Sequence, residues 1–155
     1  MVSVPQRPER VVARPREVVD YALARRALLT DLFGGRAASL EVCDAHPYLL
    51  RAARYHGEPT DVPCPVCQRG QGRRQELLTQ VTYVYADDLG AASGRPRPTR
   101  DLARLARLHE LHVYVVEVCQ VCAWNHLVTS YLLGETAPEQ ATPGGRRRRS
   151  GSRSS

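Results

Sequence analysis

Apolar and polar residues follow two different periods along this chain, and these periods predict where helices and strands lie. A helical period runs from Glu17 to Phe33 and is ended by Gly34. A second helix is predicted after Asp44, which is suited to be its N-cap. The apolar stripe of this second helix consists of Tyr48, Leu49, Ala52, Ala53 and Tyr55.

Three later segments favour strands because they are rich in β-branched and aromatic residues. They are Leu77–Ala86, Leu111–Val118 and Trp124–Leu133, the last being the most ambiguous because helical and extended patterns overlap there. A third helix is predicted between the first two strands, with Thr99 as its cap. Ser39–Cys43 is predicted to be a short extended piece.

Four of the five cysteines occur in two Cys-x2-Cys pairs, Cys64 with Cys67 and Cys119 with Cys122. Such a turn lets two thiolates converge on one ion, and two turns together make the tetrahedral sulfur site that suits Zn2+. Four thiolates leave no open position for water or substrate. We therefore predict that these four residues bind one structural zinc ion.

The two pairs are separated by 51 residues, many more than the roughly 15–20 of a minimal zinc ribbon. The predicted strand, helix and second strand between the pairs account for the excess as a helix-bearing insertion. The prediction is therefore an α+β fold: a zinc-ribbon-like antiparallel sheet with one inserted helix and two N-terminal helices.

Other uses of these side chains remain open. One is thiol-based redox chemistry by Cys43 with a Cys-x2-Cys pair, and another is an iron ion or an iron–sulfur cluster. A redox pair usually opens a helix, which Pro65 and the polar stretch after Cys67 argue against. Cys43 and His46 are spaced like a pair of metal ligands. Alternatively, Cys43 is a small buried side chain beside the start of a helix. His126 follows the second pair and is either a ligand or a polar partner near the site.

Positive charge gathers at both ends of the chain. The net charge is +6 without any lysine; residues 1–16 carry four Arg and one Glu, and residues 141–155 carry five Arg and no acid. Residues 1–15 are predicted to be a disordered basic arm, residues 16–134 a single zinc-binding domain, and residues 135–155 a disordered Arg/Ser-rich tail.

Arginines beside the first cysteine pair and in the tail are the predicted contacts to nucleic acid, because arginine binds phosphate groups. They are Arg69, Arg73, Arg74, Arg146, Arg147, Arg148 and Arg149. The sequence contains no nucleophile paired with a base and no phosphate-binding loop, so no pattern in it indicates catalysis. We expect a non-catalytic module that docks onto RNA, the ribosome or the RNA polymerase machinery. A protein–protein adaptor that uses the helix Glu17–Phe33, with zinc as a staple, fits the same features.

The location of the protein follows from what the chain does not contain. No stretch of 18 apolar residues is present, and no apolar run of signal-peptide type follows the N-terminal arginines. We therefore expect a cytoplasmic protein that has neither a membrane nor a small-molecule substrate as its partner.

Beyond the cysteines, the chain carries a distinctive set of motifs. They are Val19-Asp20-Tyr21-Ala22-Leu23, Val42-Cys43-Asp44-Ala45, Pro47 to Ala53, Val115 to Cys119 with Cys122, Trp124-Asn125-His126-Leu127 and Ser130-Tyr131. In this combination they resemble a family of small actinobacterial proteins known as a domain of unknown function. The resemblance covers about residues 16–134. It implies a single domain, and it brings no known activity with it. The paired cysteine turns are also similar to zinc ribbons of transcription and translation proteins, over four residues only.

Overall fold

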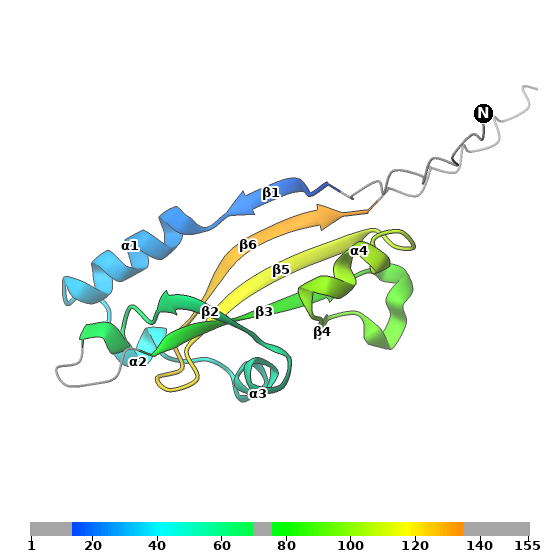
Figure 1. Ribbon diagram of the computed structural model, residues 1–155. Helices are drawn as coiled ribbons and strands as arrows, with labels where there is room; N and C mark the ends of the chain where they lie inside the picture. Colours follow the sequence, from blue (N-terminus) through cyan, green and yellow to red (C-terminus); the bar gives the residue numbers. More distant parts are fainter. Residues whose placement is uncertain (1–13, 70–75, 135–155) are drawn as a thin grey trace, which may run out of the picture.

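A computed structural model describes residues 14–69 and 76–134, which form a six-stranded antiparallel sheet flanked by helices (Figure 1). The sheet order is β1-β6-β5-β3-β2, and a short β4 also pairs with β3. The strands are β1 (Arg16–Asp20), β2 (Glu58–Pro63), β3 (Leu77–Tyr85), β4 (Arg95–Pro96), β5 (Leu111–Val118) and β6 (Asn125–Leu133). The α-helices are α1 (Ala22–Phe33), α2 (Ser39–Val42), α3 (Pro47–His56) and α4 (Leu102–Leu105). The predicted α+β fold is confirmed.

The middle of the sheet consists of the three strands with the clearest sequence pattern. β5 has its predicted bounds, and β3 and β6 are each one residue shorter than predicted. β3 pairs with β5 without a break, from Thr79 opposite Val118 to Tyr85 opposite His112. None of the described helices is long and apolar enough to cross a membrane.

Two helices cover opposite faces of this sheet. α3 packs on a buried cluster that includes Val81 and Val118, and α4 packs on a cluster that includes Val84 and Val113. Because alternate residues of a strand point to opposite faces, Val81 and Val84 lie on different sides of β3. α3 lies near the turn between β5 and β6, and α4 lies toward the other end of the strands (Figure 1).

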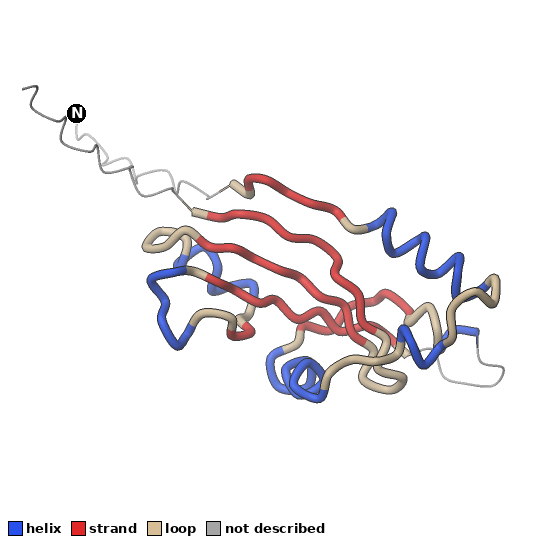
Figure 2. Tube along the Cα trace, turned by 180° about the vertical axis from the view of Figure 1, so that it is seen from behind, coloured by secondary structure: helices blue, strands red, loops and turns tan. Residues whose placement is uncertain are grey.

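The N-terminal element differs from the predicted helix Glu17–Phe33. Its first residues form β1 at the edge of the sheet beside β6, and α1 begins only at Ala22 (Figure 2). The β-branched pair Val18 and Val19 favours an extended chain where the edge of β6 accepts a partner. The carboxylate of Asp20 then accepts the backbone N–H of Ala22 at 2.8 Å and starts the helix. The helix prediction is therefore wrong for its first turn.

Four smaller features also differ from the predictions. The third helix, α4, begins at Leu102 and not with Thr99 as its cap, because Thr99 instead donates hydrogen bonds to the Glu58 carboxylate. Residues 39–42 are helical rather than extended, and the Glu41 carboxylate accepts the N–H of Ala38 at its start. β2 is not predicted because Pro59 indicates a break, but a strand at the sheet edge tolerates proline. In α3 the alanines of the predicted stripe are buried, whereas Tyr48 and Tyr55 are 72% and 68% exposed.

A buried carboxylate connects α1 to the sheet. Glu117 of β5 is 6% exposed and accepts hydrogen bonds from Trp124 Nε1 at 3.0 Å and from Arg25 Nε at 2.5 Å. Trp124 is fully buried, and the Arg25 guanidinium lies 5.9 Å from the centroid of its ring. Because a charge is stable inside a protein only when it is paired, Arg25 and Trp124 together keep Glu117 in place.

Replacing Arg25 with alanine is expected to lower the free energy of unfolding by about 3 kcal/mol, because it leaves Glu117 buried without its cation. Urea unfolding of the purified protein measures this change. The matched control is Arg26→Ala, which removes an exposed arginine from the same helix and should change the free energy by less than about 0.5 kcal/mol. Equal losses in the two variants would contradict the role given to the Arg25–Glu117 pair.

Candidate metal centre

The four paired cysteines converge in the folded chain. The Sγ atoms of Cys64, Cys67, Cys119 and Cys122 all lie within 4.8 Å of one another. The sulfur of Cys64 is 3.6 Å from that of Cys122, and the sulfur of Cys67 is 3.8 Å from that of Cys119. Sulfurs at the corners of a tetrahedron around zinc, with Zn–S bonds of about 2.3 Å, are separated by about 3.8 Å. The spacing of the thiols therefore fits one tetrahedral metal ion.

The sheet brings the two cysteine turns together. The first turn lies between β2 and β3, and the second turn connects β5 to β6. β3 and β5 are adjacent and antiparallel, and Thr79 near the start of β3 pairs with Val118 at the end of β5. Both turns therefore emerge at the same end of the sheet, although 51 residues separate them in sequence.

The two turns share one hydrogen-bond pattern. In each, the sulfur of the first cysteine, Cys64 or Cys119, accepts hydrogen bonds from the backbone N–H groups two and three residues later. The carbonyl of that cysteine accepts the N–H four residues later, at 3.0 Å in both turns. The second turn ends at Ala123, whose φ of 66° is a left-handed conformation that residues other than glycine rarely adopt. The N–H groups that donate to the two sulfurs place partial positive charge beside them, as metal-bound thiolates require.

Apolar side chains surround the sulfurs. Cys64, Cys67 and Cys119 are buried, whereas Cys122 is half-buried. Val42, Leu78 and Trp124 are the other buried members of the cluster, and Leu28, Leu29 and Leu32 of α1 pack against it. A dry shell of this kind restricts the access of water to a bound metal.

Burial also changes the acidity of the thiols. Burial raises the pKa of Cys64 to about 12, and it raises the pKa of Cys67 and of Cys122 as well. At Cys119 burial acts in the same direction, but hydrogen bonds from backbone N–H groups and neighbouring cysteines outweigh it and lower the pKa. A coordinated divalent cation reverses the effect of burial, because it deprotonates the thiols that it binds.

Cys43 is a fifth thiol beside the set of four. Its Sγ lies 3.6 Å from the sulfur of Cys122, although it does not belong to the mutually close group. Its expected companion, His46, instead caps α3, where His46 Nδ1 accepts the N–H of Tyr48 at 3.1 Å. Cys43 is therefore a neighbour of one proposed ligand, while His46 has a structural role in the helix.

His126 lies next to the site without joining the sulfur group. Its ring stacks on that of Trp124, with the planes 12° apart and the centroids separated by 6.1 Å. Its Nδ1 is 2.7 Å from the backbone oxygen of Leu127. Of the two alternatives for His126, this geometry corresponds to a polar partner near the site.

Arg69 is the predicted nucleic-acid contact that falls within the described residues. Its guanidinium lies 3.3 Å from the ring centroid of Phe33 at the end of α1. Arg69 is therefore placed against an aromatic ring of its own chain. Arg73, Arg74 and Arg146–Arg149 lie outside the described residues, and their contact with nucleic acid stays a prediction.

Sequence patterns alone did not indicate the residues that support the metal turns. Glu117 lies in a strand in which its neighbouring residues are valines. A charged residue at such a buried strand position was the available signal that Glu117 has a structural partner. Trp124, the single tryptophan, directly follows the second turn. The sequence raised Cys43 as a partner of a Cys-x2-Cys pair, but which cysteine it meets depends on the tertiary fold, which brings it to Cys122.

Comparison with known proteins places these features in a family. A family of unknown function (DUF5318) matches residues 12–149. The uncharacterized protein Rv0049 of Mycobacterium tuberculosis is 48% identical over 127 residues, which cover 81% of this chain and 88% of that protein. The uncharacterized protein Mb0050 of Mycobacterium bovis has the same identity and coverage. No solved structure matches the chain. The resemblance to an actinobacterial family of unknown function is confirmed.

One metal ion per chain is expected, and Cys119→Ser should abolish its binding because it removes one of four ligands. The matched control, Cys43→Ser, removes a cysteine outside the group of four and should keep the full metal content. Elemental analysis of the purified variants measures this difference.

Chelation of the metal should unfold at least the part from Pro63 to Leu133, because a structural zinc contributes on the order of 10 kcal/mol to folding. Circular dichroism during heating, with and without chelator, follows this loss. Unchanged thermal stability after metal removal, or equal metal loss in the Cys43 and Cys119 variants, would contradict the site.

Proposed function

The chain belongs to the family of unknown function DUF5318, and we propose that it is a non-catalytic zinc-binding module that docks onto a macromolecular partner. The observation that carries this proposal is the group of four thiols at tetrahedral spacing. A metal with four protein ligands has no position for a substrate, so its role is structural. We assign residues 16–134 to one domain that this metal holds together.

Zinc is the metal we propose, in preference to iron. Four cysteine ligands in two Cys-x2-Cys turns are typical of structural zinc, which has no redox chemistry of its own. The buried sulfurs and their apolar neighbours suit an ion that stays bound. Cysteines that bind zinc must stay reduced, and a reducing compartment keeps them so. This supports a cytoplasmic location.

The partner that we propose is nucleic acid, either as RNA or within the ribosome or the RNA polymerase machinery. The net charge of +6 favours association with polyanions. The arginine clusters at both ends of the chain add to this attraction, because phosphate contacts dominate the affinity of such proteins.

Nucleic acid is expected to co-purify with the tagged, native protein at low salt and to be released at high salt, because phosphate contacts weaken steeply as salt rises. The ratio of absorbance at 260 and 280 nm, before and after nuclease treatment, detects it. The Cys119→Ser variant, whose metal site is not intact, is the control that shows whether retention depends on that site. A parent protein that retains neither nucleic acid nor ribonucleoprotein at low salt would contradict the partner, but not the zinc site.

Cys43 favours a second candidate function, a thiol-based redox sensor. Cys43 and Cys122 are both partly accessible, and their sulfurs are 3.6 Å apart. A peroxide can oxidise this pair: the Cys43 thiol and the metal-bound Cys122 thiolate form a disulfide, and hydrogen peroxide takes up the two electrons, the proton of Cys43 and one proton from solvent to become two waters. The disulfide would remove Cys122 from the metal and release zinc.

Hydrogen peroxide is therefore expected to release zinc faster from the parent protein than from Cys43→Ser, which lacks the partner sulfur. A zinc-binding dye follows the release, and mass spectrometry of peptides identifies a disulfide between Cys43 and Cys122. If both proteins lose zinc at the same rate without this disulfide, the sensor is excluded and the structural role of the metal is unaffected.

A protein–protein adaptor that uses α1 is the third candidate. Leu23 of this helix is 76% exposed, and none of the twelve residues of α1 is fully buried. The co-purification experiment separates this alternative from the first, because nuclease treatment removes bound nucleic acid and leaves a protein held by α1 in place.

A further inference from the structure

The outer surface of α3 carries aromatic and basic side chains that the core does not use. The helix packs on the sheet through Ala52 and Ala53, which are 6% and 3% exposed. Tyr48 and Tyr55 lie on its outer side and remain largely exposed. Both rings offer apolar surface to a partner, although one face of Tyr48 already stacks on the ring of His46, with the centroids 4.9 Å apart.

Two arginines lie against these rings. The Arg51 guanidinium is 6.0 Å from the ring centroid of Tyr48, and the Arg54 guanidinium is 5.7 Å from that of Tyr55. α3 contains no acidic residue, and neither arginine forms an ion pair with a carboxylate in residues 14–69 or 76–134. The surface thus presents two positive charges that no carboxylate of the described chain neutralises.

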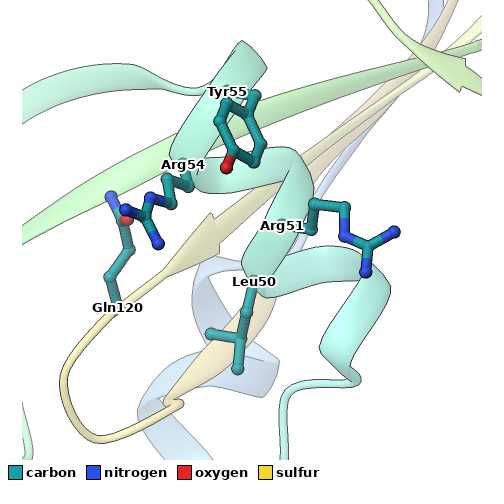
Figure 3. A pocket seen from close by; sticks show the side chains of 5 residues that line it. All are labelled: Leu50, Arg51, Arg54, Tyr55 and Gln120. Carbon is teal, nitrogen blue, oxygen red and sulfur yellow. The ribbon is translucent and has the colours of Figure 1, made fainter.

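A pocket of about 400 Å3 lies between this helix and the second cysteine turn. It is lined by Leu50, Arg51, Arg54, Tyr55 and Gln120 (Figure 3). Arg54 and Gln120 lie together at one side of the helix, and Arg51 points to the other side (Figure 3). The amide of Gln120 donates a hydrogen bond to Thr79 Oγ1 at 3.1 Å, which orients this wall of the pocket.

The metal turn is linked directly to the start of α3. The N–H of Ala45 donates to the carbonyl of Ala123 at 3.0 Å, and the amide of Asn125 donates to the carboxylate of Asp44 at 3.0 Å. The position of α3 relative to Gln120 therefore depends on the second cysteine turn.

We propose that the outer surface of α3, together with Gln120, binds single-stranded nucleic acid. Exposed bases stack on Tyr48 and Tyr55, while Arg51 and Arg54 contact the phosphates on either side. Aromatic rings combined with a basic surface are the means by which proteins bind single strands. A duplex fits less well because its bases are already stacked inside. The inference rests on the proposed function, since it names the partner's chemistry and the surface that meets it.

Fluorescence anisotropy with a labelled 12-nucleotide RNA, a DNA of the same sequence and the corresponding duplex tests this surface on the zinc-loaded full chain. We expect the single strands to bind more tightly than the duplex, and the two single strands show which sugar is preferred. The double variant Tyr48→Ala/Tyr55→Ala should bind at least about tenfold more weakly, because each stacked base contributes substantially to affinity. Tyr48→Phe/Tyr55→Phe keeps both rings and should retain the binding.

Arg51→Ala/Arg54→Ala should also weaken binding and lower the slope of log affinity against log salt by about 1.4, the value for two lost phosphate contacts on a single strand. The matched control is Arg104→Ala/Arg107→Ala, which removes two exposed arginines in and just after α4. This control should leave both the affinity and the slope close to those of the parent protein.

Several results would overturn the proposal. These are tyrosine-to-alanine variants that bind as tightly as the parent, a duplex that binds as well as a single strand, an equal loss in the α4 control, and displacement of the RNA by polyglutamate as effectively as by unlabelled RNA. If the α3 variants keep their zinc and their affinity while the parent binds RNA, this surface is wrong and the proposed function stands. If the zinc-loaded parent binds no oligonucleotide, the nucleic-acid partner is wrong as well.

Discussion

The structure depends on the convergence of four sulfur atoms from two turns that lie 51 residues apart in the sequence. Packing four thiols in an apolar cluster gains little by itself, because thiols are weak hydrogen-bonding groups and burial disfavours the ionisation of three of them. A divalent cation changes this balance, since it turns the same crowding into four bonds. The sheet supplies the geometry, because adjacent strands β3 and β5 each place a turn at the same end. The proposed metal then holds together a domain whose nine aromatic residues include seven tyrosines.

The helices α1 and α3 are both connected to the end of the sheet that carries the cysteine turns. α1 is connected through the Arg25–Glu117 ion pair, and Glu117 in turn binds the indole of Trp124 directly after the second turn. α3 is connected through the backbone hydrogen bond between Ala45 and Ala123. Both helices present exposed side chains to the outside, while the inner leucines of α1 contact the cluster around the cysteines and the inner alanines of α3 contact the cluster of Val81 and Val118. The surfaces available to a partner are therefore oriented by an internal site that a partner need not touch.

The sequence predicted the local part of this arrangement, and the rest depended on tertiary context. The cysteine spacing was enough to predict the group of four, and alternation with β-branched residues was enough for β3, β5 and β6. Val18 and Val19 lie within the segment predicted as a helix, but pairing along the edge of β6 makes them part of a strand. Periodicity placed Tyr55 in the buried stripe because it does not distinguish an aromatic residue that packs inside from one that is exposed. The stacking of Arg69 on Phe33 could not be predicted, because the two residues are brought together only by folding.

The wide separation of the two turns has a consequence for how the chain is made. The first pair of cysteines emerges from the ribosome long before the second, and at 5–20 residues per second the 51 intervening residues take about 3–10 s to synthesise. During that interval Cys64 and Cys67 are thiols without their partners. The second pair lies in the short connection between β5 and β6, where closing a small loop carries little entropic cost. The late hairpin therefore forms quickly around its own two sulfurs, and assembly of the domain waits on translation.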